Sequence, residues 1–165
     1  MKKSLLYLLI LSPMVTATPL SLALQALYEQ QSVTQMLNVE QYNAATINQV
    51  GNSNLATISQ SGGYQNLVAI LQYGDNNQTL VSQTGRGNEA ITVQYGNSNF
   101  ISLEQTGENN RASINQIGNE QSYSLIQTGE HNQIQINDYG VGFSINEQQI
   151  SQTGDFQQLT INHYK

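Results

Sequence analysis

The chain has 165 residues, of which 38% are hydrophobic and 10% are charged, and its formal net charge at pH 7 is −6. Charged residues make up roughly 25% of ordinary soluble proteins, and here Asn, Gln, Ser, Thr and Gly take their place. The acidic balance argues against nucleic acid as a partner, and the absence of cysteine excludes disulfides, thiolate chemistry and Cys-based zinc sites.

Residues 1–23 are predicted to be a secretory signal peptide. Lys2 and Lys3 precede a short apolar run over residues 5–11, which is too brief to span a bilayer as a helix. Small side chains favour cleavage after Ala17 or Ala23. We therefore expect a secreted protein, with a retained anchor as the alternative.

Residues 24–42 show no repeat, and we expect them to be a flexible leader. The repeated region covers residues 43–165, where glycines recur every eleven residues apart from two short insertions, one near Gly63 and one around residues 143–145. Because glycine adopts the positive φ that tight chain reversals require, each of these positions predicts a turn. The turn glycines are Gly51, Gly62, Gly74, Gly85, Gly96, Gly107, Gly118, Gly129, Gly140 and Gly154.

Each eleven-residue unit reads as one strand followed by one turn. In the unit that ends at Gly96, alternation with a period of two places Asn88, Ala90, Thr92 and Gln94 on one face of a strand. Disordered polar tracts have no reason to keep aliphatic residues at such a fixed phase. The repeat therefore favours an ordered β structure.

The turns alternate between two kinds, so the full period is twenty-two residues. One kind reads Gln-Thr-Gly, as at Gln105-Thr106-Gly107, and the other carries a bulky apolar residue, as at Gln94-Tyr95-Gly96. This alternation predicts two strands per coil in two facing parallel sheets, with coils stacked about 4.8 Å apart. The predicted fold class is all-β, a short β-solenoid of about five 22-residue coils.

Stacking of the coils aligns like residues into columns along the solenoid axis. Amide side chains in such columns can bond to the like residue above and below, which allows Asn and Gln to face inward beside a thin apolar core. The predicted stacking ladders are Asn43, Asn66, Asn88, Asn110 and Asn132; Gln49, Gln72, Gln94 and Gln116; and Gln60, Gln83, Gln105, Gln127 and Gln152.

One apolar group is predicted on an outward face. The alternation directs Leu67, Ala69 and Leu71 outward on one coil, with Ile91 and Val93 next to them on the following coil. A contiguous apolar area on a polar sheet indicates a binding surface for a partner or a membrane. The alternative is a face covered by the leader.

The polar residues do not form a catalytic or metal-binding pattern. His131 lies in a turn and His163 occupies a glutamine column, and neither has a second ligand at a suitable spacing. Glu104 and Glu108 fall on an outward position and in a turn, where solvated carboxylates are expected. We therefore expect no enzyme, no cofactor, no metal and no small-molecule substrate. A glycan- or ice-binding solenoid remains an alternative binding class.

The pattern resembles the curlin repeat of bacterial functional amyloid. Residues Gln49 to Gln60 match its frame of Gln-x-Gly-x-x-Asn-x-Ala-x-x-x-Gln throughout, and the frame returns from Gln105 to Gln116 with Ala112. The resemblance covers residues 43–165. It implies an amyloid-like solenoid that is secreted across the outer membrane into an extracellular fibre at the bacterial cell surface, supporting adhesion and biofilm. The implied partners are the major curlin subunit, further copies of the chain, and outer-membrane curli assembly and secretion factors.

Within that family the chain looks more like the minor, nucleating subunit than the major, fibre-forming one. It lacks a Gly-rich leader, its first repeat opens with Asn43-Ala44-Ala45, and Gly62-Gly63 leads into an aliphatic run, as nucleators tend to show. The last repeat of a nucleator is usually basic, whereas residues 157–165 carry only His163 and Lys165. The major subunit is the alternative.

The ends of the solenoid are predicted to be open sheet edges. Natural proteins often blunt such edges with proline or charge, and no proline follows Pro19. We therefore expect strand addition at Asn43–Gln49 and at Gln157–His163.

Overall fold

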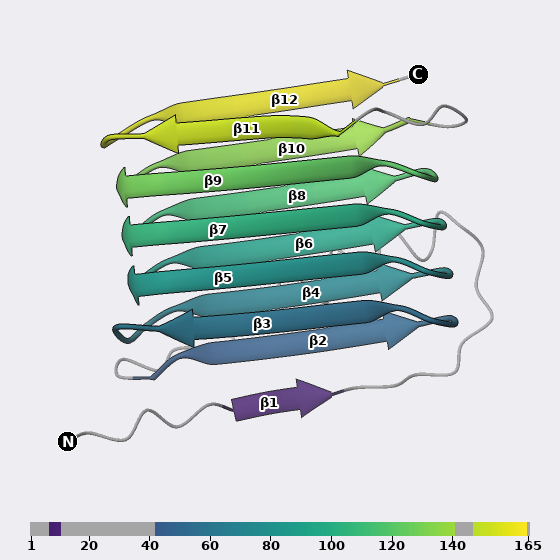
Figure 1. Ribbon diagram of the computed structural model, residues 1–165, viewed down its shortest axis with the longest axis horizontal. Helices are drawn as coiled ribbons and strands as arrows, with labels where there is room; N and C mark the ends of the chain where they lie inside the picture. Colours follow the sequence, from purple (N-terminus) through teal and green to yellow (C-terminus); the bar gives the residue numbers. More distant parts are fainter. Residues whose placement is uncertain (1–6, 11–41, 141–146, 165) are drawn as a thin grey trace.

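The computed structural model describes residues 7–10, 42–140 and 147–164, and within these ranges the chain is all-β (Figure 1). Strands alternate between two sheets that lie face to face, and each coil stacks on the one before. None of the described residues forms a helix that is long and apolar enough to cross a membrane.

One sheet has the order β1-β2-β4-β6-β8-β10-β12, and the facing sheet has the order β11-β9-β7-β5-β3. We call them the even sheet and the odd sheet, although β1 also belongs to the former. From β2 to β12 the even sheet supplies both the first and the last strand. The strands are β1 (Tyr7–Ile10), β2 (Ala44–Val50), β3 (Leu55–Ser61), β4 (Leu67–Tyr73), β5 (Gln78–Arg86), β6 (Glu89–Tyr95), β7 (Phe100–Glu108), β8 (Arg111–Ile117), β9 (Ser122–Glu130), β10 (Gln133–Tyr139), β11 (Gln148–Thr153) and β12 (Gln158–Tyr164).

All neighbouring strands pair in parallel, and the register follows the repeat. Glu89 pairs with Arg111, twenty-two residues later, through the middle of the solenoid. The offset is twenty-three between Leu55 and Gln78, which places one extra residue between β3 and β4. It is twenty-five between Gln133 and Gln158, and the insertion predicted around residues 143–145 lies outside the described residues. The predicted β-solenoid of about five coils, with two strands per coil, is confirmed.

A thin apolar core lies between the sheets because alternate side chains of every strand point inward. Ile70, Ile114 and Ile136 are completely buried in the even sheet, and Leu103 and Leu125 face them from the odd sheet. The core reaches the ends of the stack through half-buried Ile47, Ile58, Ile150, Leu159 and Ile161. Stacked identical columns thus give the small core its continuity.

The turns require glycine for two reasons. Gly96 has a φ of +117°, which side chains rarely adopt, and a Cβ on it would overlap the carbonyl oxygen of Gly118 in the next coil. Ser98, two residues later, adopts the left-handed conformation with a φ of +58°. Nine of the ten predicted turn glycines share the positive φ, and Gly140 does not. A side chain at these glycines therefore has no room beside the next coil.

The prediction of an open apolar patch is wrong. Ala69, Leu71, Ile91 and Val93 are at most 8% exposed, and Leu67 is half-buried. Leu71 and Val93 form a second apolar cluster with Tyr73, and water is excluded from these adjoining side chains. Binding of a partner by these residues stays a prediction.

Two buried threonines, one on β6 and one on β5, allow a test of what stabilises the core. The hydroxyl of Thr92 is buried in the isoleucine column without a hydrogen-bond partner. We expect Thr92→Val to raise the free energy of unfolding by about 1–2 kcal/mol, because it removes an unsatisfied polar group. The measurement is the midpoint of urea unfolding followed by circular dichroism.

Thr79 supplies the matched control. Its equally buried hydroxyl donates to Gln94 Oε1 at 2.9 Å and lies 3.2 Å from Gln72 Nε2. Thr79→Val should therefore lower stability, and a gain at both positions would contradict the assignment.

Candidate functional site

The glutamine column of the odd sheet joins all five of its strands. Gln60, Gln83, Gln105 and Gln127 each donate from Nε2 to Oε1 of the glutamine in the next coil, over 2.8–2.9 Å, and the column ends at Gln152. Each of these amides also donates to a backbone carbonyl of the even sheet, as Gln105 does to the carbonyl of Glu89 at 3.0 Å. The column therefore ties coil to coil and sheet to sheet.

The glutamine column of the even sheet has the same direction. Nε2 of Gln49 donates to Oε1 of Gln72 at 2.7 Å, Gln72 donates to Gln94 at 2.8 Å, and Gln94 donates to Gln116 at 2.9 Å. Every amide thus points its donor toward the C-terminal end and its acceptor toward the N-terminal end. This polarity makes the two ends of the column chemically different.

The asparagine column fixes the turns. The backbone N–H and Nδ2 of Asn88 both donate to Oδ1 of Asn66, at 3.0 and 3.1 Å. Nδ2 of Asn88 also donates to the carbonyl of Gly107, the turn glycine of the following coil, at 3.0 Å. Equivalent bonds hold Asn43, Asn66, Asn110 and Asn132, and the column ends where the backbone N–H of Gln157 donates to Asn132 Oδ1.

Sequence reasoning missed a second asparagine column at the opposite row of turns. Asn54, Asn77 and Asn99 bond from one coil to the next, and Asn77 Nδ2 donates to the carbonyl of Gly96 at 2.8 Å. The signal was present, because each of the three stands three residues after a turn glycine, as Asn88 does.

The even glutamine column changes character at its C-terminal end. Asp138 takes the place after Gln116 and is completely buried. Its carboxylate accepts from the Tyr123 hydroxyl at 2.8 Å and from the Gly140 N–H at 3.1 Å, and His163 Nδ1 lies 2.9 Å from Oδ1. Burial, together with the bond to Asp138 and its charge, raises the pKa of Tyr123 well above the ordinary value. Tyr123 therefore stays a hydrogen-bond donor.

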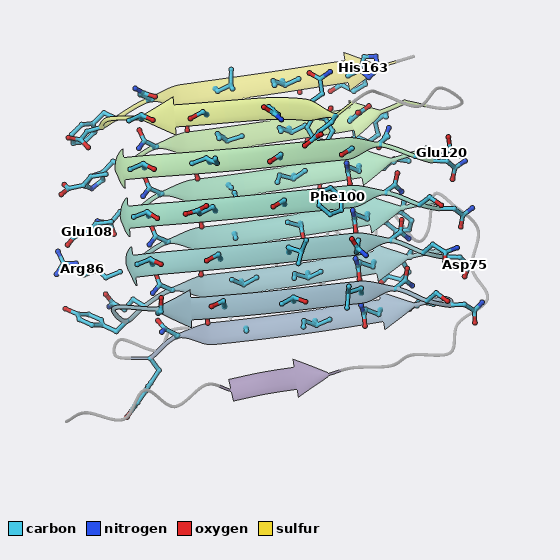
Figure 2. The ribbon with its side chains drawn as sticks, in the orientation of Figure 1. Asp75, Arg86, Phe100, Glu108, Glu120 and His163 are labelled. Atoms are coloured by element: carbon cyan, nitrogen blue, oxygen red, sulfur yellow. The ribbon has the colours of Figure 1, made fainter. Side chains whose placement is uncertain are left out.

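Several charged groups decorate the two rows of turns (Figure 2). Arg86 and Glu108 protrude at one row and Asp75 and Glu120 at the other. Arg86 donates to Glu108 over 2.7 Å, and its pKa is raised by the hydrogen bonds that it donates to Tyr64 and Glu108. Both side chains are about half exposed, so this pair contributes little to stability.

Neither histidine joins a metal-binding group. Among the described residues no three His, Asp or Glu side chains come together as a metal site would require. His131 stacks on Phe156 in a turn, with ring centroids 4.8 Å apart, while His163 lies against Asp138.

The two ends of the even sheet differ. The N–H of Gln133 donates to the carbonyl of Gln157, so it points toward β12 and the C-terminal end. Gln158 is the residue of β12 that pairs with Gln133, and its N–H points in the same direction. Because residues alternate in direction along a parallel strand, the N–H groups of Gln158, Thr160 and Asn162 point away from β10. At β12 the predicted open edge of Gln157–His163 is therefore present.

In the chain that keeps residues 7–10, the edge at Asn43–Gln49 is partly covered, and its opening after removal of residues 1–23 stays a prediction. Residues 7–10 of β1 pair in parallel with Ala44–Ile47, so backbone hydrogen bonds cover that edge. In the odd sheet, Oε1 of Gln60 on β3 is buried without a partner. The N-terminal end of that column therefore needs a donor.

Comparison with protein families gives one match. The curlin-associated repeat matches residues 41–62, 63–96 and 96–129, which together make up more than half of the chain. The chain belongs to the curlin repeat family. No curated protein and no solved structure matches the chain. The matched repeats correspond to the coils built by β2 to β9, and the same parallel strand pairing continues through β12.

Membership of the curlin family makes the chain a curli subunit. Its members are structural, amyloid-forming components of extracellular curli fibres, and the described coils carry the repeat in its solenoid form.

The ladders can be tested at an interior and an end position. We expect Gln105→Leu to cost about 2–4 kcal/mol of unfolding free energy, because it leaves Gln83 Nε2 and Gln127 Oε1 buried without that partner. Gln60→Leu should cost clearly less, because it breaks one bond along the column instead of two, besides the bond to the Ala44 carbonyl, and removes an unsatisfied oxygen. Urea unfolding of both variants measures the difference, and equal costs would show that the column is not a continuous ladder.

Proposed function

We propose that the protein is the minor curlin subunit, which nucleates curli fibres by offering a formed sheet edge to other curlin chains. Secretion across the outer membrane, attachment of the fibre to the cell surface, and a role in adhesion and biofilm belong to the same proposal. Its partners are then the major curlin subunit, further copies of itself, and the outer-membrane assembly and secretion factors.

The open edge of β12 carries this proposal. It presents outward N–H groups at Gln158, Thr160 and Asn162, and the core beneath it ends in half-buried Leu159 and Ile161. An incoming strand of the same repeat would satisfy these backbone groups and cover this apolar edge. A template of this kind lowers the loop-closure cost that a free chain meets when it forms its first parallel pair.

The leader and the first repeats support the minor rather than the major subunit, as the sequence indicates. The alternative, a major subunit, is favoured by the regularity of the ladders, which run from Gln60 to Gln152 without a break. The two roles differ in stoichiometry. A nucleator acts at substoichiometric amounts, whereas a major subunit supplies the mass of the fibre.

The deciding experiment mixes the secreted protein, at substoichiometric amounts, with a purified major curlin subunit and follows thioflavin fluorescence. We expect the lag time to shorten strongly at ratios where the added protein contributes little fibre mass. An unchanged lag time, with fibres formed by this chain alone, would favour the major subunit. A stable monomer without any effect would favour a glycan- or ice-binding solenoid.

A proline at the open edge separates templating from folding. Thr160 is exposed on β12 and directs its N–H away from β10, so Thr160→Pro leaves the pairing of β12 with β10 in place. We expect this variant to keep its β-sheet content by circular dichroism but to lose most of its seeding of the major subunit.

Two further variants serve as controls. Thr160→Ala should seed as the parent does, whereas Ile161→Pro should also lose β content, because that N–H points toward β10. Normal seeding by Thr160→Pro would exclude the β12 edge as the template.

A further inference from the structure

We propose that His163 decides what the C-terminal edge accepts: as an imidazolium, it lets β12 join in parallel to β2 of a second copy of this chain. The inference rests on the proposed function. Its partner at the β12 edge is a second copy of this chain, and the charge of His163 controls whether that copy joins. The even sheet is where it applies, because this sheet supplies both the first and the last strand from β2 to β12.

The glutamine column of the even sheet has one polarity along its length. The Nε2 of Gln49 is engaged with Gln72 Oε1 at 2.7 Å, so Gln49 presents its own Oε1 toward the N-terminal end. Reversing the Gln49 amide would place its Oε1 against Oε1 of Gln72. The two opposed acceptors would then lie between β2 and β4 instead of at the N-terminal edge. A neighbour that stacks on β2 must therefore bring a hydrogen-bond donor at this position.

The polarity of the column reverses at Asp138. An ionised carboxylate can only accept, and the partners of this one are the Tyr123 hydroxyl, the Gly140 N–H and His163 Nδ1. His163 must therefore donate from Nδ1 back toward β10. Its position in register with Asp138 makes it the last member of the column.

The protonation state of the imidazole decides whether Nε2 donates or accepts. A neutral histidine that carries its proton on Nδ1 has a bare acceptor at Nε2, and only the protonated ring donates from both nitrogens. The two nitrogens lie on opposite sides of Cε1, so Nε2 is directed away from Asp138. His163 lies at the end of β12, where the next layer would stack (Figure 2). A neutral ring would oppose Gln49 Oε1 with a second acceptor, whereas an imidazolium would donate to it.

Among the groups around His163, the second imidazole proton is the one that we expect to change with pH. On β10 the facing group is Asp138, on β9 it is Tyr123, and on β11 the inward residue in register with Tyr123 is the neutral Gln148. Tyr123 stays protonated because its pKa is raised by burial and by Asp138. Imidazole is the side chain whose charge most often changes in the range between pH 5 and 8, so the experiment compares two pH values in that range.

Joining also needs a free β2. In the chain that begins at Met1, β1 pairs with Ala44–Ile47, and removal of residues 1–23 as the predicted signal peptide would free that edge. The experiment therefore uses protein collected after secretion, with its N-terminal residue identified by mass spectrometry. The rate at which it adds to its own sheared fibres is measured at pH 5.5 and pH 8.

We expect the parent chain to add roughly tenfold faster at pH 5.5 than at pH 8, because two opposed buried acceptors are replaced by one hydrogen bond. His163→Gln should be slow at both pH values, since the introduced amide donates to Asp138 and turns its oxygen outward. The double variant D138Q/H163Q restores a single direction along the column and should be fast at both. His131→Gln, which changes the turn histidine, should respond to pH as the parent does.

An equal parental rate at both pH values, a parental pH response in His163→Gln, or no self-addition at either pH would overturn the proposal. Circular dichroism of each variant shows that it has folded. The proposed function is tested separately, through seeding of the major subunit, so either one can fail while the other holds. Seeding of the major subunit without a pH response, for example, would leave a nucleator whose edge His163 does not control.

Discussion

Hydrogen bonding between side-chain amides along the stacking axis is the interaction on which the rest of this structure depends. The core between the sheets is thin, and charged residues are few, so neither can hold the coils in register alone. A buried amide without partners is costly, whereas Gln83, Gln105 and Gln127 each satisfy one another and a backbone carbonyl of the facing sheet. A shift by one residue would leave every member of the column unsatisfied. The ladders thus fix the register that the apolar columns need.

Much of the fold could be predicted because it repeats. The spacing of glycines, the alternation of two turn kinds and the two insertions fix the number of strands, their parallel pairing and the offsets of twenty-two, twenty-three and twenty-five residues. The inward columns follow from alternation alone. Even the missed column of Asn54, Asn77 and Asn99 was open to the same reasoning, since it obeys the spacing that identified Asn88.

The features that could not be predicted depend on residues that break the repeat or lie outside it. Alternation places Leu71 and Val93 on an outward face, but it does not tell whether that face is open, and both side chains are buried. The pairing of β1 with β2 joins segments that share no repeat. Asp138, Tyr123 and His163 come from three strands, and each alone reads as an irregularity in a column; only their contact distances reveal a hydrogen-bonded group.

The unequal size of the two sheets has a consequence for how copies can follow one another. From β2 to β12 the chain forms an odd number of strands, so it begins and ends in the same sheet. A chain with an even number could be translated along the axis and would continue both sheets without interruption. Here each junction of β12 with β2 leaves a place for one more strand in the odd sheet. The odd number of described strands from β2 to β12 therefore puts a gap in the odd sheet at every such junction, and the gap recurs once per copy along the axis.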